Sequence, residues 1–266
     1  MSDLDRAHDA MAAAPDDPLP RLRFYETLAR AELTLLLAEE PAPGDDPVPA
    51  LFDTGDGRFA LAFDSDERLA SFAEGPAAYA ALPGRALLGM IGGQGIGLGL
   101  NLGVAPSSFL MPAGAVDWLA GILAPPAPHQ PLAVADLAGR LRPPVLGAAL
   151  VAALGRKLGE SAGLARFALL AGTDGRGGLP GHVLALIGVP AGAEAPLAQA
   201  ISEAMAFAGA EPSALDVMFL AEADPLVARM GRFALRFDPP PVPDPVPEPP
   251  KPAPPGSDPS RPPRLR

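Results

Sequence analysis

Residues 79–119 read YAALPGRALLGMIGGQGIGLGLNLGVAPSSFLMPAGAVDWL, and they form the most informative stretch of this 266-residue chain. No charged side chain occurs between Arg85 and Asp117. Three kinds of structure share such a composition: a nucleotide-binding loop, a membrane span and a buried core. The order of the glycines, prolines and amides within the stretch distinguishes among the three.

The glycines at positions 92, 93, 95, 97 and 99 resemble a dinucleotide-binding loop only in their number. A GxGxxG fingerprint needs a third glycine three positions after a G-x-G pair, and it leads from a strand into a helix. Here the third glycine is missing and the predicted order is helix, glycines, strand. The chain also has no GxxxxGK[ST] phosphate loop. We therefore predict no nucleotide cofactor. We expect the glycines instead to end a helix and to let the next strand pack closely.

Residues 87–104 are long enough to cross a bilayer as a helix. Closely spaced glycines lower the helix propensity of the segment, and the amides of Gln94 and Asn101 would need partners in lipid. Pro106 closes the segment. We predict no membrane insertion and interpret the stretch as core together with an ordered loop.

The formal net charge of −11 disfavours a general nucleic-acid binder, because phosphate neutralisation requires clustered Lys and Arg. Hydrophobic residues make up 48% of the chain, which is enough for a sizeable core. Cysteine is absent, which rules out a thiol nucleophile and cysteine-based metal sites. The N-terminus is polar and acidic, unlike a secretory signal, so the expected location is the cytoplasm.

Apolar periodicity and turn residues predict mixed helices and strands in both halves of the chain. In the first half we expect helices at 3–13, 20–30 and 112–123, a helix capped by Ser65, a helix at 84–93, and strands at 33–37, 50–53, 58–63, 79–82 and 96–102. In the second half we expect helices at 144–158, 195–208 and 225–230, strands at 165–171, 182–189, 215–220 and 233–237, and a glycine-rich turn at 173–181.

The element order predicts an α+β protein with two small mixed domains at residues 1–124 and 132–238. A proline-rich linker at 125–131 separates them. Half of the residues from 239 to 266 are proline, which predicts a disordered, extended tail.

No catalytic or metal-binding constellation stands out. Ser107 and Ser108 lack a GxSxG elbow, and none of His8, His129 and His182 can be placed beside them from sequence. The histidines have no zinc-ligand spacing, and the clustered acids lack the positions of a calcium loop. A helix cap and a hairpin turn explain those acids. We predict no catalytic residue, no cofactor and no metal site.

An interaction surface is the alternative use for the polar residues of this block. Its candidate residues are Arg85, Asn101, Ser107, Ser108 and Trp118. We expect Trp118, the single tryptophan, to be buried; a partly exposed Trp118 would be a candidate interface anchor.

The first half also resembles the N-terminal domain of the SseB (enhanced serine sensitivity) family, over about residues 20–123. The resemblance rests on these motifs: Phe24-Tyr25-Glu26-x-Leu28, the strand at 33–37, Phe59 to Phe63 followed by Ser65 to Leu69, Leu82-Pro83-Gly84-Arg85, Gly99 to Gly103, Pro106-Ser107 and Asp117-Trp118-Leu119. Residues 215–220 and 233–237 resemble the C-terminal domain of the family. The resemblance implies an α+β fold and no catalytic residues, since none is established for the family.

Three functional hypotheses remain open at this point. The first is a non-catalytic cytoplasmic protein that acts through contacts with an unknown protein partner. The second is a small-ligand binder or hydrolase that uses the loop at 101–108, where polar groups interrupt an apolar block. The third is a scaffold whose proline-rich tail recruits a partner with an aromatic groove.

Overall fold

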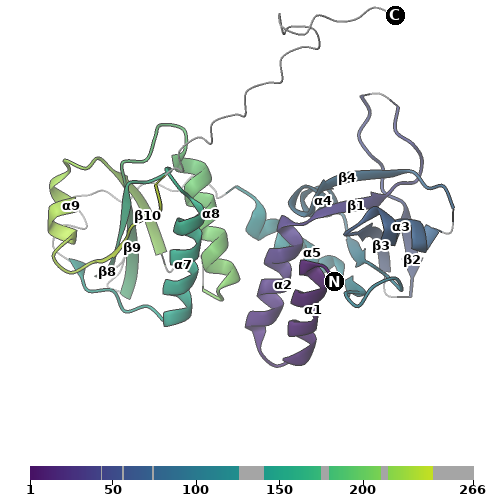
Figure 1. Cartoon of the computed structure of the whole chain (residues 1–266), viewed down its shortest axis with the longest axis horizontal. Coiled ribbons are helices and arrows are strands. Elements are labelled where there is room, and N and C mark those ends of the chain that lie inside the picture. The colour runs from purple at the N-terminus through teal and green to yellow at the C-terminus, as the bar shows by residue number, and fades with distance from the viewer. Residues whose placement is uncertain are drawn as a thin grey trace, which may run out of the picture.

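The computed structural model of the protein describes residues 1–42, 44–55, 57–73, 75–125, 141–174, 180–210 and 215–241. These residues build two mixed sheets with helices packed against them, which confirms the predicted α+β class. Figure 1 shows the two parts side by side, with the helices α2, α7 and α8 between the two sheets. The predicted linker beyond Pro125 and the predicted tail beyond Pro241 lie outside the described residues.

The N-terminal half forms a six-stranded sheet in the order β4-β1-β3-β5-β6, with β2 paired to β3. Its elements are α1 (Asp3–Ala13), α2 (Pro18–Arg30), β1 (Glu32–Leu36), β2 (Leu51–Thr54), β3 (Gly57–Phe63), α3 (Asp66–Ala73), β4 (Tyr79–Pro83), α4 (Gly84–Ile91), β5 (Ile96–Leu100), β6 (Phe109–Met111) and α5 (Ala113–Leu123). The predicted hairpin is present, because β2 and β3 pair antiparallel. β3 and β5 pair parallel, so the chain crosses over through α3, β4 and α4 between them.

Helices cover both faces of this sheet. The main core lies between the sheet and the helices α1, α2, α4 and α5, and a smaller cluster lies under α3 on the other face. The predicted close approach of the glycine-rich strand is confirmed: a Cβ added at Gly97 would lie 2.5 Å from the Phe59 ring. A Cβ added at Gly84, where α4 begins, would lie 2.0 Å from the backbone oxygen of Leu28 in α2. These positions admit only glycine because backbone or rings occupy the space of a side chain.

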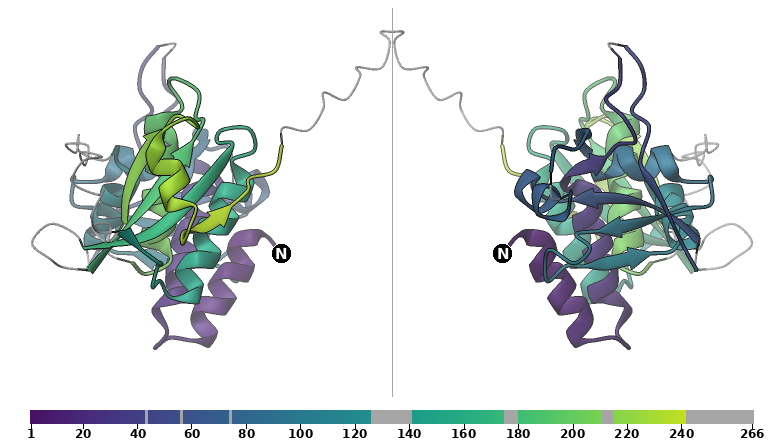
Figure 2. Two further views of the ribbon diagram at one scale, coloured as in Figure 1. Left: turned by 90° about the vertical axis from the view of Figure 1, so that its left-hand side faces the viewer. Right: turned by 90° about the vertical axis from the view of Figure 1, so that its right-hand side faces the viewer.

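The C-terminal half forms a five-stranded sheet in the order β10-β9-β8-β11, with β7 paired to β8. Its elements are β7 (Leu141–Arg142), α7 (Ala148–Glu160), β8 (Phe167–Asp174), β9 (Pro180–Ile187), α8 (Glu194–Phe207), β10 (Leu215–Leu220), α9 (Pro225–Met230) and β11 (Leu235–Phe237). α7 and α8 pack on one face of the sheet and α9 on the other. Figure 2 shows α9 on the outer face, away from the N-terminal half.

Several predicted elements differ from the structure in their bounds, and one short strand was not predicted. The helix expected at 144–158 begins only at Ala148, because Gly147 has extended backbone angles. The turn expected at 173–181 is shorter, because Thr173 and Asp174 continue the β8–β9 ladder. The strand expected at 96–102 ends at Leu100, because Asn101 has a left-handed backbone with φ 49°. The short strand β6 was not predicted, since three residues cannot show an alternating pattern.

The two halves meet through their helices. Phe207, at the end of α8, is buried in the N-terminal core. The side-chain amide of Gln199 donates hydrogen bonds to the carbonyl oxygens of Ile122 and Leu123 at the end of α5, over 3.4 and 3.3 Å. These contacts place α2 opposite α7 and α8, and this arrangement forms the cleft described below.

Candidate functional site

Asn101 and Ser107, two of the predicted surface residues, are both completely buried. The side-chain amide of Asn101 donates to the Ser107 hydroxyl over 2.8 Å and accepts from the backbone N–H of Asp64 over 3.1 Å. Among the described residues only Asn101 combines a non-glycine side chain with a positive φ, a conformation that asparagine tolerates better than most residues. The prediction that these two residues form an exposed surface is therefore wrong, because each is enclosed and hydrogen-bonded inside the protein.

The polar cluster continues to Asp5 on α1, which is 1% exposed. The Ser107 hydroxyl donates to Asp5 Oδ1 over 2.6 Å, and Arg68 donates to both Asp5 oxygens over 3.0 and 2.6 Å. Arg68 also donates to Asp64 Oδ1 over 2.6 Å. Hydrogen bonds from Arg68 are the main reason that the pKa of Asp5 lies far below its usual value; burial opposes this shift, and Ser107 adds to it.

This cluster joins three segments that are distant in sequence: α1, the start of α3, and the turn after β5. We call Asp5, Asp64, Arg68, Asn101 and Ser107 the buried polar network. Its hydroxyl and carboxylate resemble a nucleophile and its partner in type. Because Ser107 is completely buried, its oxygen has no access to a substrate in this structure. The network ties the helix α1 to the sheet.

The remaining residue of this loop, Ser108, is exposed. Its hydroxyl accepts a hydrogen bond from the backbone N–H of Gly103 over 3.2 Å, which closes the loop on itself. Two described cavities are found elsewhere on the protein, and neither is lined by residues 101–108. A ligand pocket at this loop, which the second hypothesis requires, therefore has no counterpart among the described cavities.

Arg85 lies at the start of α4 and contacts the C-terminal half. Its guanidinium donates to Glu203 Oε2 of α8 over 2.9 Å. Glu203 is buried, and Gln199 donates to its other carboxylate oxygen over 2.8 Å. Arg85 is thus part of an ion pair that joins the two halves rather than a free surface cation.

Trp118 is 45% exposed, which contradicts the expectation of burial. On α5 the core positions are Val116 and Leu119, both completely buried. Trp118 faces away from that core and rests against Tyr25 of α2, with the ring centroids 5.9 Å apart. Burial raises the pKa of the Tyr25 hydroxyl. Among the five predicted surface residues, Trp118 is the one with a large apolar side chain available to a partner.

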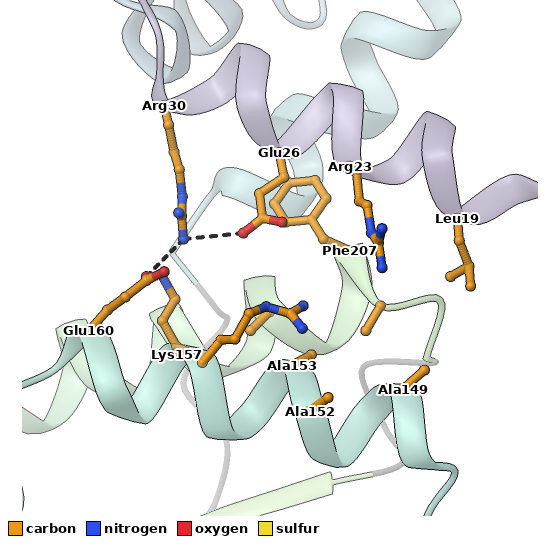
Figure 3. Close-up of a pocket in the computed structure, with 13 residues that line it drawn as sticks. Leu19, Arg23, Glu26, Arg30, Ala149, Ala152, Ala153, Lys157, Glu160 and Phe207 are labelled. Atoms are coloured by element: carbon orange, nitrogen blue, oxygen red, sulfur yellow. Dashed lines mark hydrogen bonds and ion pairs between the residues drawn. The ribbon is translucent and has the colours of Figure 1, made fainter. Parts of the chain in front are cut away.

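A second candidate site is the cleft between α2 and α7, with α8 at its base (Figure 3). It encloses about 100 Å³, and its charged lining residues are Arg23, Glu26 and Arg30 from α2 and Arg156, Lys157 and Glu160 from α7. Figure 3 shows Arg30 bridging Glu26 and Glu160, each over 3.1 Å. Burial favours the neutral form of Glu160, but Arg30 and Lys157 outweigh it and lower the pKa of that carboxyl.

Within the described ranges, no cluster of three or more His, Asp or Glu side chains is arranged to hold a metal ion. No helix in the described part of the chain is long and apolar enough to cross a membrane. Two surfaces of the described structure are therefore candidate binding sites: the face of Trp118 and the cleft between the halves.

Sequence reasoning missed two features. Asp5 and Arg68 are 63 positions apart, and no local pattern relates them. The cleft cations were missed because α2 and α7 belong to different halves of the chain.

Comparison with protein families bears on the N-terminal half. Residues 4–118 match the family model of the SseB protein N-terminal domain. The matched region begins earlier than the resemblance seen in the sequence, because it includes α1 and therefore Asp5. It contains the whole buried polar network and reaches Trp118 at its end. No curated protein and no solved structure matches the chain significantly.

Proposed function

We propose that this protein is non-catalytic and acts through protein contacts, with the face around Trp118 of the SseB N-terminal domain as the docking surface. The single observation that carries the proposal is the 45% exposure of Trp118 on a helix whose core positions, Val116 and Leu119, are completely buried. Exposing a large aromatic side chain to water costs free energy, and burial of such a side chain is a principal source of affinity at interfaces.

The contact with Tyr25 supports the role of an anchor. Trp118 and Tyr25 come from different helices, and their rings lie at an interplanar angle of 56°. Because Tyr25 is buried, it limits the positions that the indole can adopt. A side chain that is held in place loses less conformational entropy on binding than a mobile one. The indole N–H also provides a donor for the partner.

The buried polar network supports the non-catalytic part of the proposal. The residues whose chemistry would suit an enzyme, Ser107, Asp5 and Arg68, are already bonded to one another inside the fold. We propose further that the chain consists of two domains, at 1–124 and 132–238, that the second is of the SseB C-terminal type, and that the protein works in the cytoplasm. The acidic net charge supports a soluble protein or one with a basic partner.

The test compares Trp118→Ala with Tyr79→Ala, a matched control. Tyr79 is an exposed aromatic residue of the same domain, on strand β4. Partners captured from native lysate with the tagged full chain would be identified, purified and titrated against each variant. We expect Trp118→Ala to weaken binding by about thirtyfold, as for a hot-spot residue worth about 2 kcal/mol, and Tyr79→Ala to leave it unchanged.

Trp118 provides an independent measurement, because it is the single tryptophan of the chain. Binding at this face should shift the emission maximum of Trp118 to shorter wavelength and protect it from acrylamide. A partner that binds both variants equally well, and leaves the emission unchanged, would refute the assignment of this face.

A further inference from the structure

The cleft between α2 and α7 carries an excess of positive charge in an acidic protein. Four cations and two carboxylates line it, which leaves a local formal charge of +2, against −11 for the whole chain. Each helix contributes two cations and one carboxylate. Cations gathered in a cleft attract anions more strongly than the net charge of the protein repels them, because screening weakens the distant charges.

Two of these cations have no partner among the described residues. Arg30 pairs with Glu26 and Glu160, and Lys157 pairs with Glu160. Neither the Arg23 nor the Arg156 guanidinium makes a hydrogen bond or ion pair within the described part of the chain. Figure 3 shows the Arg23 side chain extending from α2 toward α7. Two unpaired guanidinium groups therefore line one small cleft from opposite sides.

The other lining residues add no acceptor side chain to Glu26 and Glu160, both of which pair with Arg30. They are apolar, and five of them are alanines: Leu19, Ala149, Ala152, Ala153, Ala204, Phe207 and Ala208. Short side chains on α7 and α8 keep the cleft open. Its volume of about 100 Å³ is below the roughly 300–1,000 Å³ of a pocket for a drug-sized molecule.

We propose that this cleft binds a phosphate-class anion between Arg23 and Arg156. A guanidinium presents a planar fork of donors that suits the oxygens of a phosphoryl group. A tetrahedral anion can receive two such forks from different directions at once, whereas the two oxygens of a carboxylate lie in one plane. The anion would also relieve the repulsion between the two arginines.

The site requires both halves of the chain, since Arg23 lies on α2 and Arg156 on α7. A bound phosphoryl group would therefore hold the SseB N-terminal domain against the C-terminal half. This proposal does not depend on the role of Trp118, because it concerns a small anion and a different set of residues.

The test is calorimetric titration of the full-length protein with inorganic phosphate and, separately, with glycerol phosphate, at constant ionic strength maintained with chloride. Variants are Arg23→Ala and Arg156→Ala, with Arg23→Gln and Arg156→Gln in reserve should the respective alanine variant fold poorly. Arg21→Ala is the matched control: it removes the same charge from the same helix, but Arg21 does not line the cleft.

We expect saturable binding by the wild type and by Arg21→Ala, and binding weaker by about tenfold or more in each cleft variant, since charged hydrogen bonds are lost. The melting temperature should rise with phosphate concentration in the same two proteins alone. Tighter binding of the ester would indicate a phosphorylated metabolite, and equal binding would indicate the free ion. Absence of saturable binding, or equal affinities in all variants, would overturn the proposal.

Discussion

Replacing Arg68 with methionine tests the role of the buried polar network most directly. The change removes the guanidinium but keeps an unbranched apolar side chain of comparable length. In the wild type this guanidinium donates two hydrogen bonds to Asp5 and one to Asp64. The two carboxylates are 1% and 5% exposed in their side chains, so water cannot readily replace the lost donors.

The expected cost follows from these contacts. Removing one partner of a buried ion pair typically costs 3–5 kcal/mol, because an uncompensated charge stays inside. The Arg68 side chain is 20% exposed, so some water can reach the site that it leaves. We therefore expect the lower end of the range, about 3 kcal/mol. That is a large share of the roughly 5–15 kcal/mol by which a domain is stable.

The assay is urea denaturation followed by Trp118 fluorescence, which reports on the N-terminal half because the chain has no other tryptophan. Asp5→Asn and the double variant Asp5→Asn/Arg68→Met complete a thermodynamic cycle. We expect the double variant to be more stable than the sum of the single effects predicts, by about 1–2 kcal/mol. Arg21→Met serves as the matched control on an exposed arginine and should change stability by less than about 0.5 kcal/mol.

Two results would refute this reasoning. The first is a loss below about 1 kcal/mol for Arg68→Met, which would mean that the two carboxylates find other partners or water. The second is strict additivity of Asp5→Asn and Arg68→Met, which would mean that the two side chains do not stabilise each other.

Three further predictions address other parts of the structure. Gly84→Ala should destabilise the protein by about 3 kcal/mol or more, or prevent folding, because its Cβ would lie 2.0 Å from a backbone oxygen. Gly89→Ala, on the same helix, has open space around its Cβ and should be neutral or stabilising. Thermal melts compare the two variants. The folded-state pKa of Asp5 lies below its unfolded value of about 3.9. Asp5 therefore contributes its full stabilisation above about pH 3.9 and loses it as the pH falls further. The stability of Asp5→Asn should depend less on pH in this acid range, which acid-unfolding curves would measure. Arg85→Ala leaves the buried carboxylate of Glu203 without its cation. We expect the amide hydrogens of α8, at the interface between the halves, to exchange faster in this variant, which hydrogen exchange would detect. Unchanged exchange would show that the ion pair does not hold the halves together.

Much of the secondary structure could be predicted from local sequence. Ser65 was expected to cap a helix, and its hydroxyl accepts from the N–H of Arg68 over 3.4 Å. The Asp-Gly turn predicted the β2–β3 hairpin, and the strand at 215–220 agrees with β10. These features depend on neighbouring residues along the chain, so a local pattern contains the information. The strand β6 was missed because three residues cannot show an alternating pattern.

The candidate sites were less predictable. The sequence drew attention to Asn101 and Ser107 because polar groups interrupt an apolar stretch. That pattern does not distinguish an exposed polar loop from a buried one whose hydrogen bonds are satisfied by Asp5 on α1. Trp118 was expected in the core because tryptophan is mostly buried, and an average preference does not show which side of a helix meets the core.

By itself, the sequence determined the α+β class, the order of most helices and strands, and the glycines at which backbones approach closely. It also predicted that the glycines of the stretch at 79–119 lead from a helix into a strand, as α4 and β5 do. Only the tertiary structure decided which polar residues are enclosed, that Trp118 is half exposed, and that Arg23 and Arg156 line one cleft. The physical reason is range: caps, turns and periodicity act over a few residues, whereas burial and charge pairing depend on segments that the fold brings together from more than 60 positions apart.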